Sequence, residues 1–366
     1  MLERQCIEPF LLARARDKWS GRGGYWLIRP ARSPDRSSGR TALEKTMATD
    51  FFLSILLALC AASFAATALL TRYAWPVCER LGLIDLPDAR KQHAQATPLL
   101  GGPALIGIML PLALLATWLS PLSGDIALLH LAAATAGVAL VGILDDRRPL
   151  SARVRVGLAF VLFGGLALYN KAFLIRRLVF PMFGVQFGLY YEVVALVFTV
   201  VCCVGLINAV NMADGKNGLV LGLCIGWLGL IMARSTAGDI PFMAVMLLGL
   251  IALLVMNLRG RLFLGDGGAY GLAAAIGLLA IRSYSSHLDD PATGLSGEIV
   301  VLLFFVPVFD SFRLTFARLA RGQSPMMGDR DHLHHHLQNR FGWPNGLYIY
   351  LLLALAPAAL ATALLL

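Results

Sequence analysis

The chain has 366 residues, 58% hydrophobic and 14% charged, with a mean hydropathy of +0.71. Soluble domains carry about 25% charged residues, so this composition excludes an ordinary soluble protein and favours one with many membrane-spanning segments. The net charge of +9 is no argument for a nucleic-acid partner, because ten basic residues lie in the first 46 positions and the remainder holds 21 basic and 17 acidic residues. We therefore expect no nucleic acid to bind.

Long apolar runs follow one another along most of the chain. A membrane-spanning helix needs roughly 20 predominantly apolar residues, and only helices and closed barrels can span lipid. The runs are too long and too uniformly apolar for barrel strands, so we predict an all-α, polytopic transmembrane helical bundle. About ten spans are expected, near 51–71, 99–119, 126–144, 155–170, 189–208, 217–233, 241–257, 268–282, 297–315 and 346–366. The fourth and eighth of these runs are the shortest.

Lysine and arginine residues indicate the orientation of the bundle. The odd-numbered connections carry 16 of them and the even-numbered connections 5, and positive residues stay on the cytoplasmic side. The odd-numbered connections, where the polar motifs lie, should therefore face the cytosol. The connection 170–188 alternates apolar residues around Pro181 and Gly184 and predicts a small hairpin. Beyond the ninth run we expect a helical extension, broken by Gly322 and Pro325, that resumes around the histidines.

The first 46 residues differ from the rest. They are rich in Arg, Ser and Gly, hold no apolar run long enough for a signal peptide, and are typical of disorder. We interpret 47–366 as one membrane domain and propose that Met47 is the true start. The six cysteines form no metal-type or redox-type pair and receive no role.

Two acidic motifs follow apolar runs. Asp145 and Asp146 end the third run; because neighbouring helical residues point about 100° apart, one can act on a phosphate or metal while the other anchors the loop. A solvated helix end is an equally good interpretation of an acid pair alone. Asp266 lies in the segment FLGDGG, where a carboxylate between glycines suits Mg²⁺, although a simple Gly-Asp turn would look the same.

The segment NAVNMADGKNGL is the richest in polar groups. It places amides, an acid and two glycines between two apolar runs. Gly215 and Gly218 permit tight turns and close backbone approach, and the helix that follows Asn217 can offer free N–H groups to phosphate. An ordinary capped turn needs fewer polar groups, so we predict a functional loop. Its candidate residues are Asn208, Asn211, Asp214 and Asn217.

Histidines dominate the segment DRDHLHHHL. On a helix His332 would share a face with His335 or His336, while His334 would point elsewhere. Together with Arg330 they can bind anionic oxygens. Zinc is the rival ligand, but the spacing is unusual for a zinc site and no cysteine lies nearby, so we favour phosphate or nucleotide. Lys91 and His93 form a basic cluster with Arg90 where a lipid headgroup would lie, although such a cluster can also simply set topology.

These motifs, in this order, resemble the polyprenyl-phosphate N-acetylhexosamine-1-phosphate transferases of glycosyltransferase family 4. The resemblance runs from about Arg72 to Leu337, and DGKNGL with HLHH is its most specific pair. Within the family, SPMMGDRDHLHHHL resembles the bacterial undecaprenyl-phosphate N-acetylglucosamine-1-phosphate transferases. The branch that uses UDP-N-acetylmuramoyl-pentapeptide is similar but lacks this histidine pattern.

The resemblance implies a reaction and roles. Undecaprenyl phosphate would attack the β-phosphate of a UDP-N-acetyl-sugar, releasing UMP, at the cytosolic face of the bacterial inner membrane. Asp145 and Asp146 would bind or deprotonate the lipid phosphate, Asp266 and Asn211 would hold Mg²⁺ (or Mn²⁺), and Asp214 and Asn217 would lie beside the nucleotide or sugar. Arg330, His332, His334 and His335 would hold the sugar diphosphate. Bilayer lipid and a second copy of the chain are the other expected partners.

Three positions depart from the family pattern. Pro149 replaces the third acid of the motif DDxxD, Asn217 stands where many relatives have Asp, and Ala269 replaces a serine. Neither Pro149 nor Asn217 can act as a base, which leaves room for a different N-acetylated sugar. A transporter is the competing class, but transporter sites lie near the bilayer midplane, often between inverted repeats, whereas these polar residues gather at one face.

Overall fold

The computed structural model describes residues 36–87, 95–122, 125–288, 294–323 and 331–365, with side chains from Thr49 onward. Residues 36–46, part of the stretch 1–46 that the sequence predicts to be disordered, are helical and begin helix α1. The prediction for residues 1–35 lies outside the described residues. Residues 48–366 form one compact unit. The predicted start at Met47 stays a prediction.

The compact unit is a bundle of long helices, and all ten predicted apolar runs are helical. The helices on the N-terminal side of the bundle are α1 (Arg36–Arg72), α2 (Ala74–Leu81), α3 (Gly101–Ala104), α4 (Leu110–Leu119), α5 (Ala127–Arg147) and α6 (Ala152–Tyr169). They are followed by α7 (Glu192–Ala213), α8 (Leu219–Met232), α9 (Ile240–Leu258), α10 (Gly265–Ser286), α11 (Gly297–Ala320), α12 (Leu333–Phe341) and α13 (Asn345–Leu364).

Eight helices of the described chain are long and apolar enough to cross a membrane, which confirms the polytopic helical class. The expected order of lengths was wrong. Helix α8, in the sixth run, is the short one with 14 residues, whereas the fourth and eighth runs form helices of 18 and 22 residues. Whether α8 and α10 span the bilayer as well stays a prediction.

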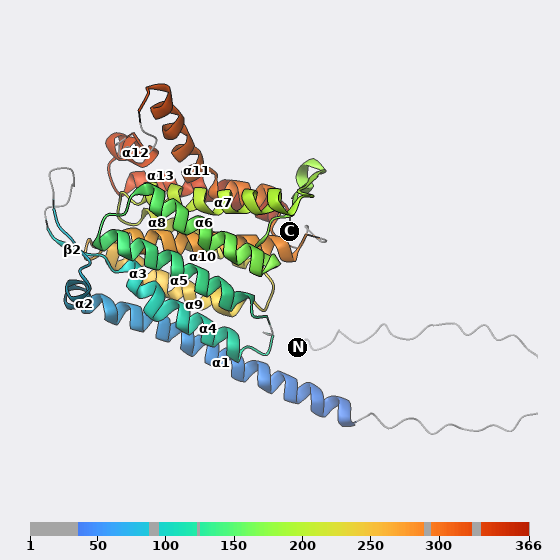
Figure 1. Ribbon diagram of the computed structural model, residues 1–366. Coiled ribbons are helices and arrows are strands. Elements are labelled where there is room, and N and C mark those ends of the chain that lie inside the picture. Colours follow the sequence, from blue (N-terminus) through green and yellow to red (C-terminus); the bar gives the residue numbers. More distant parts are fainter. Residues whose placement is uncertain (1–35, 88–94, 123–124, 289–293, 324–330, 366) are drawn as a thin grey trace, which may run out of the picture. The chain divides into compact units, whose positions relative to one another are not determined.

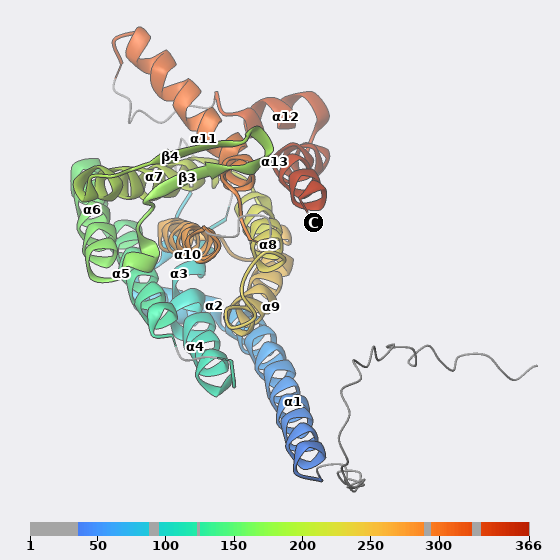
Figure 2. The same ribbon diagram turned by 90° about the vertical axis from the view of Figure 1, so that its right-hand side faces the viewer.

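Helix α10 is the centre of the bundle. Figure 2 views the helices nearly end-on and shows α10 surrounded by its neighbours, and it packs against α3, α5, α7 and α8. Every residue from Gly267 to Tyr284 is buried. A helix that is apolar and small all round is suited to such a fully enclosed place.

The second run is one helix with an irregular turn. A π-helical segment, η1 (Leu105–Met109), joins α3 to α4, directly before Pro111 at the start of α4. Proline has no N–H and its ring collides with the preceding turn, so the wider π turn accommodates it. Two short antiparallel pairs complete the fold: β1 (Ile84–Asp85) with β2 (Thr97–Pro98), and β3 (Arg177–Phe180) with β4 (Val185–Gly188).

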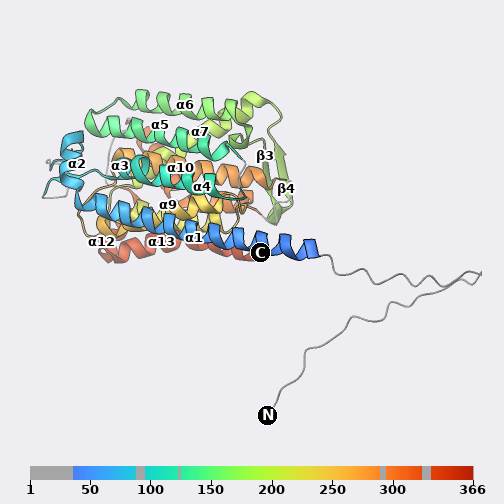
Figure 3. The same ribbon diagram turned by 90° about the horizontal axis from the view of Figure 1, so that it is seen from below.

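The strand pairs mark the two ends of the bundle. The pair β3–β4 confirms the predicted hairpin; the 3₁₀ turn η2 (Lys171–Phe173) precedes it, and the 3₁₀ turn η3 (Pro181–Phe183) joins its two strands. Figures 1 and 3 show α2, β2 and α12 at the end opposite to this hairpin. Because successive helices run antiparallel, the odd-numbered connections all lie at the α2–α12 end. The predicted break at Gly322, which has a φ of 66°, is also confirmed.

Candidate active site

The acidic motifs of α5 and α10 meet at the α2–α12 end. The Asp146 carboxylate accepts the N–H of Asp266 at 2.9 Å and that of Gly267 at 3.0 Å. These are among the N–H groups that the first turn of a helix leaves without an internal partner. The positive end of the helix dipole also lies at this turn and favours a carboxylate there. Gly265 precedes them with a φ of 73°, and a Cβ there would lie 2.8 Å from Asp146 Oδ2, so this turn requires glycine.

Asp145 points away from Asp146, as two adjacent helical residues must. Its Oδ1 accepts the N–H of Leu150 at 2.7 Å and its Oδ2 pairs with Arg155 Nη1 at 2.6 Å. The side chain is 5% exposed, so both oxygens are used in holding the α5–α6 turn. The prediction that Asp145 acts together with Asp146 on a lipid phosphate stays a prediction.

Arg155 links the two acidic motifs and was not among the predicted site residues. Besides Asp145, its Nη1 donates to the Tyr270 hydroxyl at 3.1 Å and lies 3.9 Å from Asp266 Oδ2. The Asp266 side chain remains about one third exposed. In the sequence Arg155 is one of four arginines after Asp146, and nothing in the spacing distinguishes it from the others.

The NAVNMADGKNGL segment is split between a helix and a turn. Asn208 lies within α7, where its amide donates to the Val204 carbonyl at 2.8 Å, and it lines a small pocket with Arg155 and Tyr270. The carbonyl of Asn211 accepts the N–H of Asp214 at 3.2 Å, which ends α7.

Asp214 is half-buried and no hydrogen bond to its carboxylate is present among the described residues. Loss of solvent, followed by repulsion from Asp146, raises the pKa of Asp214 to about 7. The carboxylates from three connections thus influence one another at this end of the bundle. Gly218, at a φ of 85°, then starts α8 and donates to Asn257 Oδ1 at 2.6 Å.

The histidine segment contributes a buried imidazole. His334 is 1% exposed and neither ring nitrogen has a hydrogen-bond partner among the described residues. Burial, followed by the neighbouring His335 and His332, lowers the pKa of His334 to about 3, so the ring is neutral. A Cβ at Gly215 would lie 2.6 Å from its Nε2. The prediction that His334 helps to hold the sugar diphosphate stays a prediction.

His332 and His335 support the buried ring. His332 precedes α12, and its Nδ1 lies 3.0 Å from Asp310 Oδ2, which also accepts the N–H of Leu333 at 3.1 Å. The rings of His334 and His335 are 4.2 Å apart. Asp310 was missed, although an acid inside the ninth apolar run, which also holds Glu298 at its start, is itself a signal of function. His336 is exposed and pairs with Asp331 at 2.7 Å.

A cleft of about 1090 Å³ lies at the same α2–α12 end of the bundle, and arginines give its wall a positive charge. Its wall includes Arg72 and Trp75 from α1 and α2 and Asn217, Arg259, Arg261 and Phe263 from the other side. The three arginines are exposed, and none has an acidic partner among the described residues. Such a wall suits a ligand with phosphate groups and a planar ring. Lys91, His93 and Arg330 lie outside the described residues.

The same end of the bundle can hold a hard cation. Among the described residues no three His, Cys, Asp or Glu side chains lie close enough to form a complete metal site. A site with fewer protein ligands still fits Mg²⁺, because this ion is usually held by one or two carboxylates, water and substrate phosphates. The half-open Asp266 carboxylate is of this kind, and the pairing of Asp266 with Asn211 stays a prediction.

Comparison with known proteins places the chain in a family. The model of the family described as glycosyl transferase family 4 matches residues 128–284. A Yersinia pestis protein named undecaprenyl-phosphate alpha-N-acetylglucosaminyl 1-phosphate transferase is 31% identical over 306 residues, which cover 78% of this chain and 77% of the relative. The chain belongs to glycosyl transferase family 4.

Two further relatives extend this family 4 likeness. An Escherichia coli (strain K12) protein of the same name as the Yersinia relative is 29% identical over 317 residues, covering 82% of this chain and 80% of the relative. A Mycolicibacterium smegmatis protein named decaprenyl-phosphate N-acetylglucosaminephosphotransferase is 28% identical over 285 residues, with 70% and 69% covered. The matched family segment starts in α5 and ends in α10, and so contains Asp146, Asp214 and Asp266.

Proposed function

We propose that this family 4 protein transfers N-acetylglucosamine 1-phosphate from UDP-N-acetylglucosamine to undecaprenyl phosphate. An oxygen of the lipid phosphate attacks the phosphorus attached to the sugar. The bond from that phosphorus to the bridging oxygen breaks, and UMP leaves with that oxygen. The observation that carries the proposal is the meeting of three carboxylates and a buried imidazole beside a basic cleft, in a chain whose relatives are named for this class of transfer.

The cleft is the proposed donor site. Phosphoryl transfer depends on positioning and charge neutralisation, and Arg72, Arg259 and Arg261 supply positive charge around a space large enough for a nucleotide. Phe263 and Trp75 offer flat surfaces for the base, and Asn217 offers an amide at the inner wall. His334 does not line this cleft; its ring nitrogens are buried and its Nε2 faces Gly215, so we propose that it holds the DGKNG turn in place.

Asp214 is the proposed base. Of the three predicted catalytic carboxylates, Asp145 and Asp146 are engaged by backbone N–H groups and Arg155, whereas the Asp214 carboxylate is free of such bonds among the described residues. A base works best when its pKa is near the operating pH, and that of Asp214 is about 7. It can accept a proton from the lipid phosphate when that phosphate arrives protonated.

Mg²⁺, or Mn²⁺ in its place, is the proposed cofactor, with Asp266 and Asn211 as its protein ligands. When bound it would neutralise charge on the donor diphosphate and help UMP to leave. Arg155 lies between Asp145 and Asp266 and keeps the Asp266 carboxylate from drawing away from the site. Asp146 fixes the first turn of α10, from which Asp266 projects.

The membrane setting follows from the same chemistry. A donor made in the cytosol and a lipid phosphate anchored in the bilayer can meet only at the cytosolic membrane face. We therefore propose the bacterial inner membrane, with the α2–α12 end inside.

Membranes that contain the protein, incubated with isotope-labelled UDP-sugars and undecaprenyl phosphate, test the proposal. We expect a lipid-diphospho-N-acetylglucosamine by mass spectrometry, with UMP in equal amount. Asp266→Asn should reduce product at least about a hundredfold, since even partners of metal ligands contribute 10- to 100-fold. No lipid-linked sugar with any UDP-N-acetyl-sugar, or full activity of Asp266→Asn, would contradict the transfer or the role of Asp266, respectively.

A further inference from the structure

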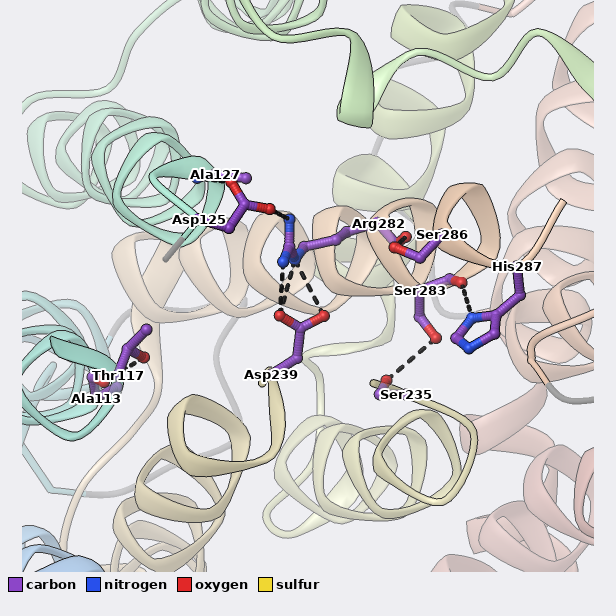
Figure 4. A network of polar contacts seen from close by, with 10 residues as sticks. All are labelled: Ala113, Thr117, Asp125, Ala127, Ser235, Asp239, Arg282, Ser283, Ser286 and His287. Atoms are coloured by element: carbon purple, nitrogen blue, oxygen red, sulfur yellow. Dashed lines mark hydrogen bonds and ion pairs between the residues drawn. The ribbon is translucent and has the colours of Figure 1, made fainter. Parts of the chain in front are cut away.

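A second buried polar cluster surrounds Arg282, near the other end of α10. The Arg282 guanidinium is enclosed by two carboxylates, as Figure 4 shows. Its Nε lies 3.0 Å from both oxygens of Asp239, its Nη2 lies 2.8 Å from Asp239 Oδ1, and its Nη1 lies 2.7 Å from Asp125 Oδ2. Arg282 is 7% and Asp239 2% exposed. None of these residues belongs to the predicted site.

The two acids come from different elements and connect α10 to both sides of the bundle. Asp239 precedes α9, and Asp125 precedes α5, where it also accepts the N–H of Ala127 at 2.8 Å. One turn of helix α10 is thereby attached to the starts of two neighbouring helices. The forked geometry of a guanidinium on a carboxylate fixes orientation as well as distance.

Beside Arg282, Ser283 bonds to Ser235 and Arg234, and Tyr284 bonds to the β3–β4 hairpin. Between its two ends, however, α10 offers little that would fix its position along the bundle. It meets α5 through glycine and alanine: a Cβ at Gly142 would lie 2.6 Å from Gly267 Cα, and one at Gly271 would lie 2.7 Å from Ala139 Cβ. Small residues let helix backbones approach closely, but they provide few interlocking side chains. The sliding and rotation of such a helix must be limited by its polar contacts.

Those polar contacts lie at the two ends of helix α10. Asp266 and Arg282 are sixteen residues apart, which is about 24 Å along a helix, and no proline interrupts α10. At the first end Asp146 holds the N–H groups of Asp266 and Gly267. A shift at Arg282 must therefore be transmitted to the place from which Asp266 projects.

We propose that Arg282, through Asp239 and Asp125, is a positioning residue that sets the axial place and rotation of α10 and thereby the place of Asp266 in the active site. The inference rests on the proposed function only for its catalytic consequence. Its physical content is a coupling between the two ends of one helix.

Arg234 provides a matched control. It is 2% exposed and lies at the same end of the bundle, and its Nη2 donates to the Thr362 carbonyl of α13 at 2.6 Å. A bond to α10 is made by its main-chain carbonyl, which accepts the Ser283 hydroxyl at 3.0 Å and is kept when the side chain is replaced. Arg234→Gln and Arg282→Gln therefore remove buried guanidinium contacts of similar burial, and both should lower the unfolding temperature of the purified protein. Only Arg282→Gln should move α10.

The first measurement needs no activity. Asp266→Cys places a thiol on the first turn of α10. The rate at which a maleimide alkylates this thiol reports the surroundings of that turn. The rate measured for the protein that keeps Asp266 is subtracted as the background from native cysteines. We expect Arg282→Gln to change this rate severalfold, Arg282→Lys to change it less, and Arg234→Gln to leave it unchanged. Asp239→Asn, which alters no volume, provides the same test if Arg282→Gln does not fold.

The second measurement uses the chain with Asp266 intact. In Arg282→Gln the Mg²⁺ concentration for half-maximal product formation should rise severalfold, with a smaller change in the donor KM, and Arg282→Lys should restore part of the loss. Unchanged alkylation and an unchanged Mg²⁺ requirement, with only the unfolding temperature lowered, would overturn the proposal. A wild type that makes no lipid-linked sugar would refute the proposed function instead, and the alkylation rates would still decide the coupling.

Discussion

At the scale of single residues, Gly215 is the position where the sequence motif and the geometry agree most closely. It is exposed and its backbone does not have a positive φ, yet a Cβ there would lie 2.6 Å from His334 Nε2 and 3.3 Å from its Cε1. Glycine is thus required by the close approach of an imidazole from α12. The DGKNG and HLHHH motifs are therefore in direct contact, although Gly215 and His334 are 119 positions apart in the sequence.

We predict that Gly215→Ala displaces His334 and weakens donor use. Forcing a methyl group into a filled space costs about 1–3 kcal/mol, so product formation at low donor concentration should fall roughly tenfold or more. Gly205→Ala is the control, because Gly205 lies in α7 with open space around it and the change favours helix by up to about 1 kcal/mol. Steady-state kinetics in detergent decide; equal donor KM values for both variants would contradict the contact.

His334 should also give the protein an acid-sensitive stability. The unfolded imidazole takes up a proton below about 6.5, whereas burial keeps the folded ring neutral down to a pKa of about 3. The unfolded state therefore binds more protons over this interval, and stability falls as the pH is lowered through it. At pH 4.5 the loss would be about 2 to 3 kcal/mol.

The measurement is the unfolding temperature between pH 4.5 and pH 8. His334→Asn should show a shallower decline at low pH than the wild type, whatever its stability at pH 8. His336→Asn removes an exposed imidazole that pairs with Asp331 and should decline like the wild type. Parallel curves for all three proteins would show that the buried ring does not control this dependence.

The sequence could predict which residues matter but not how each is used. The acid pair, the DGKNG turn and the histidines stand out because charged and amide groups beside apolar runs are costly. Their separate uses depend on tertiary partners: Asp145 pairs with Arg155, and His334 is buried against Gly215. Arg155 itself resembles any topology-setting arginine until Tyr270 and Asp266 are seen beside it.

At the scale of elements, apolar length predicted the helices well and their environment poorly. Hydropathy counts carbon-rich residues, and it therefore ranks α1, which is largely exposed, above α10. The central place of α10 depends instead on its glycines and alanines, which permit contact with α5 at close range. The short length of α8 was missed because the NG turn at Asn217 and Gly218 and the polar residues from Arg234 onward limit the helix from both sides.

Tyr284 connects the β3–β4 hairpin to α10 by two hydrogen bonds. Its hydroxyl accepts the N–H of Val179 at 2.8 Å and donates to the Arg177 carbonyl at 2.8 Å. We predict that Tyr284→Phe lowers the free energy of unfolding by about 1–2 kcal/mol, because a partly buried N–H loses its acceptor. Product formation should be retained, since Asp239 and Asp125 still hold Arg282 at this end of α10.

Thermal unfolding and product assays on the same preparations test this prediction. Tyr348→Phe removes an exposed hydroxyl from α13 and should change neither quantity. If Tyr284→Phe lost activity as Arg282→Gln is expected to, the hairpin would have to be counted among the elements that position α10.

At the scale of the whole molecule, alternation of the helices brings distant segments to one end. The first connection is joined to the seventh by the bridge between Leu99 and Phe263, and the third to the seventh by Asp146. The fifth meets the ninth where Gly215 touches His334. One face of the membrane must therefore hold the whole active site, whichever face it is.

This sidedness can be measured with single cysteines on exposed positions. Arg148→Cys in the α5–α6 turn and Asn339→Cys on α12 belong to the active-site end, and Phe183→Cys is at the tip of the hairpin, where Phe183 is 73% exposed. Because lysine and arginine residues favour the cytosolic side, an impermeant maleimide should label the first two in inverted vesicles and the third in right-side-out vesicles. Protein without these replacements gives the background from native thiols such as the exposed Cys202. Labelling of the Arg148→Cys and Asn339→Cys variants from opposite sides would separate α5 from α12 and remove the common pocket on which the proposed transfer depends.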